Sequence, residues 1–137
     1  MAYVRSKPDE INVLASEANW AWPQALRDIF KPRGVNLIVA KAADEFVNII
    51  EQKRIHTTII DTDSSRTGGL TTIKIIRMDY PMIPSLVLSS RADDDLLERS
   101  LELGVFSVIA KPVDMGVLQR QLDRLFMKVY NCDIFAA

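Results

Sequence analysis

The chain of 137 residues has only one cysteine, Cys132, and only one histidine, His56. A lone cysteine cannot form an internal disulfide, and it has no thiolate partners for a metal cluster. A lone histidine excludes a multi-histidine zinc site and offers no obvious Ser-His-Asp triad. The sequence also lacks the roughly 18 consecutive apolar residues that span a bilayer, and its first ten residues contain no apolar signal core. These absences predict a cytoplasmic protein that has no membrane partner.

A strong excess of charge of either sign is missing as well. Lysine and arginine total 17, aspartate and glutamate total 18, and the formal net charge is −1 at pH 7. Such a balance gives no electrostatic footprint for nucleic acid, so this chain alone is not expected to bind it. Hydrophobic residues make up 48% of the chain and charged residues 26%, which is an ordinary globular composition. Length and composition together predict one domain of common size.

Short apolar segments alternate with helix-favouring segments along the chain. The apolar segments, each predicted to be a buried strand, cover residues 11–15, 35–40, 57–60, 85–88 and 105–110. Predicted helices follow them at about 23–30, 43–50, 70–78, 93–101 and 114–126. Residues 70–78 favour a strand by propensity but also show a helical row of apolar residues, and they are predicted as a helix because strands and helices alternate up to that point. Five βα units in succession predict an α/β fold, a doubly wound five-stranded parallel sheet with helices on both faces.

The same pattern predicts the limits of the domain and the inner faces of its helices. We expect an N-terminal extension at 1–10, the folded domain at 11–129 and a C-terminal tail at 130–137. Leu97 and Leu101 are expected on the buried face of the fourth helix. The inner stripe of the last helix is expected to contain Leu118, Leu122, Leu125 and Phe126.

Polar residues that could take part in binding or catalysis lie where the predicted strands end. Asp61 ends the third strand, Ser89 ends the fourth and Lys111 follows the fifth, while Glu17 lies just beyond the first. In doubly wound sheets, ligands and chemistry are found beyond the carboxyl ends of the strands. The sequence therefore predicts that these side chains share one rim of the sheet.

Their order and spacing are informative. Ile-Ile-Asp61 is followed eight residues later by Gly69-Leu70, and Lys111-Pro112 comes fifty positions after Asp61. With Ser89 after the fourth strand, the chain resembles a response-regulator receiver domain of two-component signalling, which has a flavodoxin-like fold. The resemblance covers about residues 11–126.

The resemblance implies a role for each residue at the rim. Asp61 would be the phosphoacceptor, Lys111 would supply a positive charge and Ser89 would be the switch hydroxyl that follows the phosphoryl oxygens. A bound Mg²⁺ would supply further charge. A sensor histidine kinase or a phosphotransfer protein would be the input partner. The output would be an effector protein or a second copy that binds the face at 93–126, and the domain would not be an enzyme.

The sequence departs from the family where the metal is usually held. An acidic pair normally ends the first strand, but Ala15 and Ser16 stand there in this chain. Alanine supplies no ligand and serine is a poor neutral ligand for Mg²⁺. Glu17, Asp61 and Asp63 are the carboxylates that remain as candidate Mg²⁺ ligands. The aromatic residue that often acts as a switch in the fifth strand is Val108 here.

Other interpretations of the same residues stay open. The domain could be a pseudo-receiver, which binds partners without phosphorylation. It could also be a small flavin-binding or enzymatic protein of the same topology, although the loop from Ser16 to Trp22 has no glycine to cradle a phosphate. Asp61 and Lys111 could be a plain ion pair, and Ser89 could be a helix N-cap.

Overall fold

The protein folds as the predicted series of five βα units. A computed structural model of the chain describes residues 10–17, 22–63, 69–90 and 94–135. The strands are β1 (Ile11–Ser16), β2 (Val35–Ala40), β3 (Thr57–Asp61), β4 (Ser85–Ser89) and β5 (Ser107–Ala110). The helices are α1 (Trp22–Phe30), α2 (Ala43–Gln52), α3 (Gly69–Asp79), α4 (Asp94–Glu102) and α5 (Met115–Tyr130), and a 3₁₀ turn, η2 (Lys31–Arg33), follows α1.

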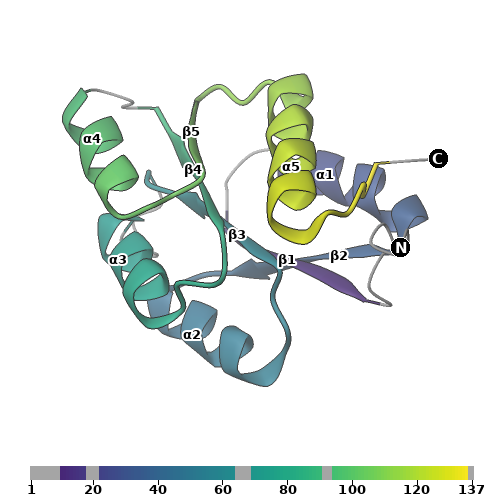
Figure 1. Cartoon of the computed structure of the whole chain (residues 1–137), viewed down its shortest axis with the longest axis horizontal. Helices are drawn as coiled ribbons and strands as arrows, with labels where there is room; N and C mark the ends of the chain where they lie inside the picture. Colours follow the sequence, from purple (N-terminus) through teal and green to yellow (C-terminus); the bar gives the residue numbers. More distant parts are fainter. Residues whose placement is uncertain (1–9, 18–21, 64–68, 91–93, 136–137) are drawn as a thin grey trace.

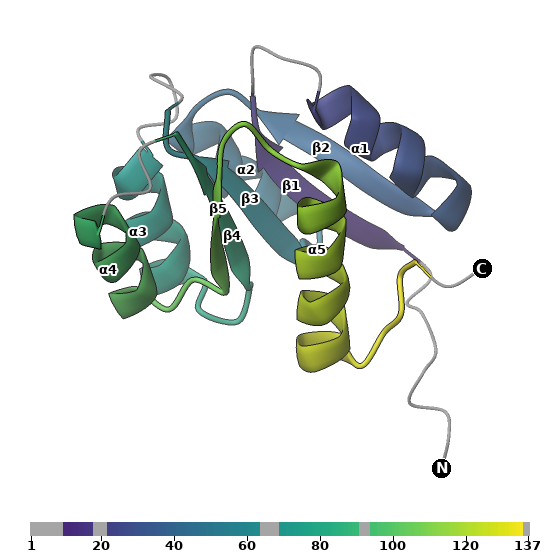
Figure 2. The same ribbon diagram turned by 90° about the horizontal axis from the view of Figure 1, so that it is seen from above.

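All five strands are parallel and form one sheet of order β2-β1-β3-β4-β5. The chain winds outward from β1 in both directions, which places α1 and α5 on one face of the sheet and α2, α3 and α4 on the other (Figures 1 and 2). This arrangement confirms the predicted doubly wound α/β fold. It also places the carboxyl ends of all strands along one edge.

Two hydrophobic cores hold the helices onto the sheet. The three inner strands, β1, β3 and β4, are buried throughout because helices cover both faces. The edge strands β2 and β5 are buried only in part. The core beneath α1 and α5 includes Leu26, Phe30, Leu118, Leu122, Leu125 and Phe126, so the predicted inner stripe of the last helix is confirmed. The opposite core includes Phe46, Ile73 and Ile76. Ile73 and Ile76 are three positions apart, which puts them on the same face of a helix.

Helix α4 departs from the prediction. Leu97 is 39% exposed and Leu101 is 53% exposed, whereas Ser100 is fully buried. The predicted buried face was therefore wrong by one residue, which corresponds to about 100° of rotation around a helix. The hydrophobic pattern selected the two leucines, but the packing of α4 turns the neighbouring residue Ser100 inward.

The last strand is also shorter than its apolar run. β5 begins at Ser107 and not at Val105. The Val105 N–H donates to Ser100 O, which belongs to the end of α4, and the Phe106 N–H donates to Ser85 O at the start of β4. Val105 is buried in the core that contains Phe46, Ile73 and Ile76, so this apolar residue packs on the core before the strand starts.

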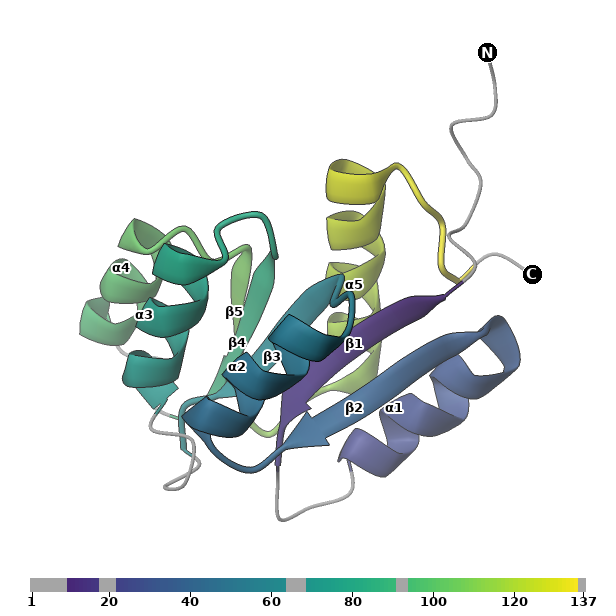
Figure 3. The same ribbon diagram turned by 90° about the horizontal axis from the view of Figure 1, so that it is seen from below.

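The chain continues into the core after α5. Asn131 ends that helix in a left-handed conformation, and Cys132 and Ile134 beyond it are fully buried. Phe135 stacks on Phe30 at a ring-centroid distance of 6.2 Å. The segment runs back toward the start of β1 (Figure 3). Residues 131–135 therefore pack on the domain, although the sequence shows no periodic pattern there.

Within the described ranges, no helix is long and apolar enough to cross a membrane. The glycine-free loop after β1, including Trp20, lies outside the described residues at 18–21.

Candidate functional site

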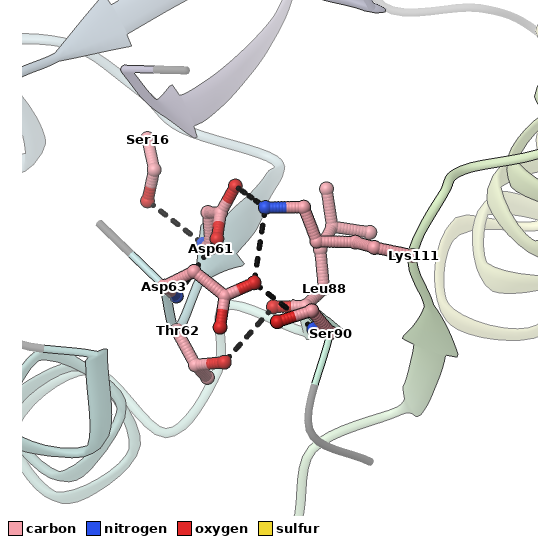
Figure 4. Close-up of polar contacts among 7 residues, drawn as sticks. All are labelled: Ser16, Asp61, Thr62, Asp63, Leu88, Ser90 and Lys111. Atoms are coloured by element: carbon pink, nitrogen blue, oxygen red, sulfur yellow. Dashed lines mark hydrogen bonds and ion pairs between the residues drawn. The ribbon is translucent and has the colours of Figure 1, made fainter. Parts of the chain in front are cut away.

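Asp61 and Lys111 form an ion pair at the carboxyl edge of the sheet. Lys111 Nζ lies 2.8 Å from Asp61 Oδ2. The side chain of Asp61 is only 3% exposed and that of Lys111 is 16% exposed. The pair forms because β3, β4 and β5 are adjacent and parallel, with Asp61 beside Leu88 and Ser89 beside Ala110. Figure 4 shows the lysine reaching across β4 to the end of β3.

A second carboxylate binds the same ammonium. Asp63 Oδ2 lies 3.1 Å from Lys111 Nζ, and it also accepts a hydrogen bond from the Ser90 N–H at 2.9 Å. The Asp63 N–H in turn donates to Asp61 Oδ1 at 2.9 Å. Asp61, Asp63 and Lys111, which we call the ion cluster, are thus joined by direct contacts (Figure 4).

The electrostatic surroundings of Lys111 and Asp63 favour the charged forms of these two side chains. Partial burial favours a neutral amine at Lys111, but hydrogen bonds and charge from Asp61 and Asp63 prevail and raise the pKa of Lys111 above its ordinary 10.5. Partial burial would also favour a neutral Asp63. The Ser90 N–H and Lys111 outweigh it and lower the pKa of Asp63 below its ordinary 3.8.

The end of β1 contributes a hydroxyl to this edge of the sheet. Ser16 is fully buried, and its Oγ accepts a hydrogen bond from the Asp61 N–H at 3.0 Å. Ala15 is fully buried as well and presents only a methyl group. The Glu17 N–H donates to Ala40 O on β2. Ser16 therefore supports the backbone that carries Asp61, and β1 brings no carboxylate into the ion cluster.

The donor set does not fit the magnesium site that the receiver family implies. Mg²⁺ requires near-octahedral oxygen coordination, usually with one or more carboxylates. Among the described residues, no three histidine, cysteine or acidic side chains gather as a metal site would require, so Glu17 does not complete a set with Asp61 and Asp63. Those two carboxylates are both paired with the Lys111 ammonium.

Ser89 and Ser90 border an open hollow beside the ion cluster. The hollow is about 560 Å³ and is lined by Thr62, Asp63, Leu70, Ser89, Ser90, Asp95 and Leu96. Ser89 is buried at the end of β4, and α4 begins five residues later at Asp94. Ser89 is therefore not the N-cap of that helix. Its position beside Asp63 is the position expected from the order of the strands.

The comparisons with known proteins agree with this fold. Residues 13–123 match the family model of the response regulator receiver domain. Because the match covers most of the chain, the protein belongs to this family, whose members are signalling modules of two-component systems. The family resemblance seen in the sequence is confirmed.

Individual relatives are distant. The chain is 20% identical to the transcriptional regulatory protein ZraR of Escherichia coli K12 over 91% of its own length and 28% of ZraR. It is 26% identical to an NtrX-like response regulator of Rickettsia typhi over 76% of its length and 23% of that protein. The chain thus spans about a quarter of the length of these curated relatives.

Solved receiver domains share the fold over nearly their whole length. The receiver domain of the Francisella response regulator 1452 superposes with a TM-score of 0.75 at 20% identity, covering 87% of this chain and 98% of that one. The signal receiver domain of an HD domain-containing protein from Pseudomonas fluorescens Pf-5 gives a TM-score of 0.78 at 18% identity, covering 89% and 98%.

Sequence reasoning located most of this site but missed two of its contacts. The structure brings Asp61, Asp63 and Lys111 together and places Ser89 beside them. The role of the Ser90 N–H was not foreseen, because every residue except proline has a backbone donor and the sequence cannot mark it. The support that Ser16 gives to Asp61 was also missed. A small polar residue at a strand end was the only signal for it.

Proposed function

We propose that this receiver domain acts in two-component signalling as a protein-interaction module whose contacts do not require a phosphoryl group on Asp61. The observation that carries the proposal is the end of β1, where Ala15 and Ser16 replace the carboxylates that would hold a divalent cation. The Ser16 Oγ is used instead as an acceptor for the Asp61 N–H.

The charge of the ion cluster supports the same conclusion. Phosphoryl transfer needs cations because negative charge is spread over the oxygens of the transferring group. Here Lys111 provides the positive charge, and Asp61 and Asp63 already share it. Two carboxylates and one ammonium leave the cluster with a net negative charge, which repels an anionic phosphodonor.

The surface at 93–126, formed by α4, β5 and α5, is the proposed interaction face. Leu97 and Leu101 on α4 are exposed large apolar residues, and such residues at a protein–protein contact supply apolar burial. The partner would be an output protein or a second copy of this chain. Receiver domains as a family act on such partners, and the face lies next to the ion cluster because Lys111 directly follows β5.

A second candidate function is that of an ordinary phosphoacceptor. The close pairing of Asp61 with Lys111 and the position of Ser89 favour it. An Asp61 oxygen would attack the phosphorus of a phosphohistidine on a sensor histidine kinase or a phosphotransfer protein. A new O–P bond would form while the N–P bond to the donor histidine breaks, and the imidazole would leave with the electron pair.

Intact-mass measurement separates the two candidates. The chain is incubated with acetyl phosphate and Mg²⁺, and an Asp61→Asn variant is treated in parallel. We expect no added phosphoryl group on the wild-type chain. A phosphoryl adduct on the wild type that is absent from Asp61→Asn would overturn the proposal and establish the phosphoacceptor function.

A further inference from the structure

The Asp63 carboxylate accepts hydrogen bonds from two different parts of the fold. Its Oδ2 accepts from Lys111 Nζ, which follows β5, and from the Ser90 N–H, which follows β4. The side chain is 29% exposed, so solvent could serve the carboxylate equally well if the donors were elsewhere. The protein instead holds one anionic oxygen between an ammonium and a backbone N–H.

These donors form an anion site directly beside Asp61. Ammonium and backbone N–H groups are the donors that bind carboxylate and phosphate oxygens most strongly. Lys111 also contacts Asp61, so a phosphoryl group bonded to Asp61 would have to share Lys111 with Asp63. Ser89 lines the same hollow as Asp63 and Ser90.

We propose that the Asp63 carboxylate is a built-in substitute for the phosphoryl group. It fills the anion site formed by Lys111 and the Ser90 N–H, and it holds both groups in the arrangement that a bound phosphoryl group would otherwise impose. This inference rests on the proposed phosphorylation-independent function, and it names the device that makes phosphorylation unnecessary.

The two donors, Ser90 and Lys111, connect Asp63 to the interaction face. Ser90 opens the connection from β4 to α4, and Lys111 opens the connection from β5 to α5. The Lys111 N–H also donates to Ser89 O at 3.0 Å. Asp63 therefore joins Ser90 to Lys111, the two residues at which these connections begin, and its carboxylate fixes their relative position while Asp61 stays unmodified.

Binding of inorganic phosphate tests whether Asp63 occupies a genuine anion site. In an Asp61→Asn background, Asp63→Ala empties the site, whereas Asp95→Ala removes an equal charge from the same hollow and leaves Lys111 and Ser90 untouched. Phosphate is titrated into Asp61→Asn and the two double variants, and the Ser90 amide resonance is followed by NMR.

We expect phosphate to bind the Asp61→Asn/Asp63→Ala variant with a dissociation constant roughly ten times lower than that of the other two proteins, as measured from the shift of the Ser90 amide resonance. Equal affinity in the two double variants would overturn the inference, because charge alone would then explain binding. Absence of binding to Asp61→Asn/Asp63→Ala would overturn it as well, because the donors would not form an anion site.

Hydrogen exchange in the otherwise wild-type chain provides a second measurement. Asp63→Ala should accelerate exchange of the Ser90 amide roughly tenfold or more, while Asp95→Ala should leave it unchanged. Unchanged exchange in Asp63→Ala would refute the contact. Neither measurement depends on acetyl phosphate, so failure of the inference is distinct from failure of the proposed function, which only the wild-type mass experiment decides.

Discussion

Lys111 Nζ lies 2.8 Å from Asp61 Oδ2, although the two residues are 50 positions apart in the chain. The contact joins the ends of two strands that are separated by β4 in the sheet. It is also largely buried, because the carboxylate is almost fully shielded from solvent. An ion pair in such surroundings costs more to break than to keep, since removal of one partner leaves a buried charge unpaired.

Removal of the Lys111 ammonium should therefore destabilise the protein strongly. We expect Lys111→Met to lower the free energy of unfolding by about 3 kcal/mol, because Asp61 would stay buried without a cation. Urea unfolding measures the change. In an Asp61→Asn background the same substitution should cost clearly less, and equal costs in the two backgrounds would show that the pair is not coupled.

Gly34 and Gly104 both have a left-handed backbone, but only Gly104 lies against a side chain, that of Arg77. Comparing the two positions tests the effect of that contact. Gly34 has φ +71° with open space around its Cβ position, and Gly104 has φ +81° with Arg77 Nη2 only 3.3 Å from that position. Arg77 cannot easily move, because it donates to Leu103 O and to Ile83 O.

We expect Gly34→Ala to lower the free energy of unfolding by about 1–2 kcal/mol through backbone strain alone. Gly104→Ala should cost roughly 1 kcal/mol more, because the new methyl group disturbs the Arg77 hydrogen bonds. Denaturant unfolding measures both changes. In an Arg77→Ala background the extra cost should vanish, and its persistence there would contradict the explanation.

His56 should make the stability of the domain depend on mildly acidic pH. The imidazole is buried, and its Nδ1 accepts a hydrogen bond from the Asn12 N–H, which requires a lone pair at Nδ1. Burial and the positive charge of Arg54 lower the pKa of His56 below its ordinary 6.5. The unfolded chain therefore binds more protons than the folded chain just below pH 6.5.

It follows that the free energy of unfolding should decrease as the pH falls from 6.5 toward the lower pKa of the folded state, by at most about 1.4 kcal/mol per pH unit. His56→Asn keeps an acceptor near the position of Nδ1 but cannot be protonated. Unfolding curves between pH 7 and pH 5 should show a flatter pH dependence for this variant. An identical pH dependence in both proteins would assign the effect to other groups.

The residues after α5 should contribute to stability. Cys132 and Ile134 are fully buried against the α1 and α5 side of the sheet. Deletion of residues 132–137 should lower the free energy of unfolding by about 3 kcal/mol, mainly from loss of the Ile134 side chain. Ile134→Ala should reproduce most of this loss, and Asp133→Ala, at an exposed neighbouring position, should not. Full stability of the truncated chain would show that the domain ends with α5.

The sequence by itself determined the alternation of strands and helices, because burial on one side of a helix or on both sides of a strand leaves a local pattern. It also determined that Asp61, Ser89 and Lys111 share one edge, since the carboxyl ends of parallel strands meet there. The substitution of Ala15 and Ser16 for an acidic pair is likewise plain in the sequence.

The tertiary structure decided which neighbours complete the site. Asp63, and not Glu17, shares the ammonium of Lys111, because the turn after Asp61 directs that carboxylate toward the Ser90 N–H. The inward side of α4 was likewise decided by packing, which buries Ser100 in place of Leu97. Such outcomes depend on the register between strands and on backbone N–H donors. Neither can be recognised from the types of residue in the sequence.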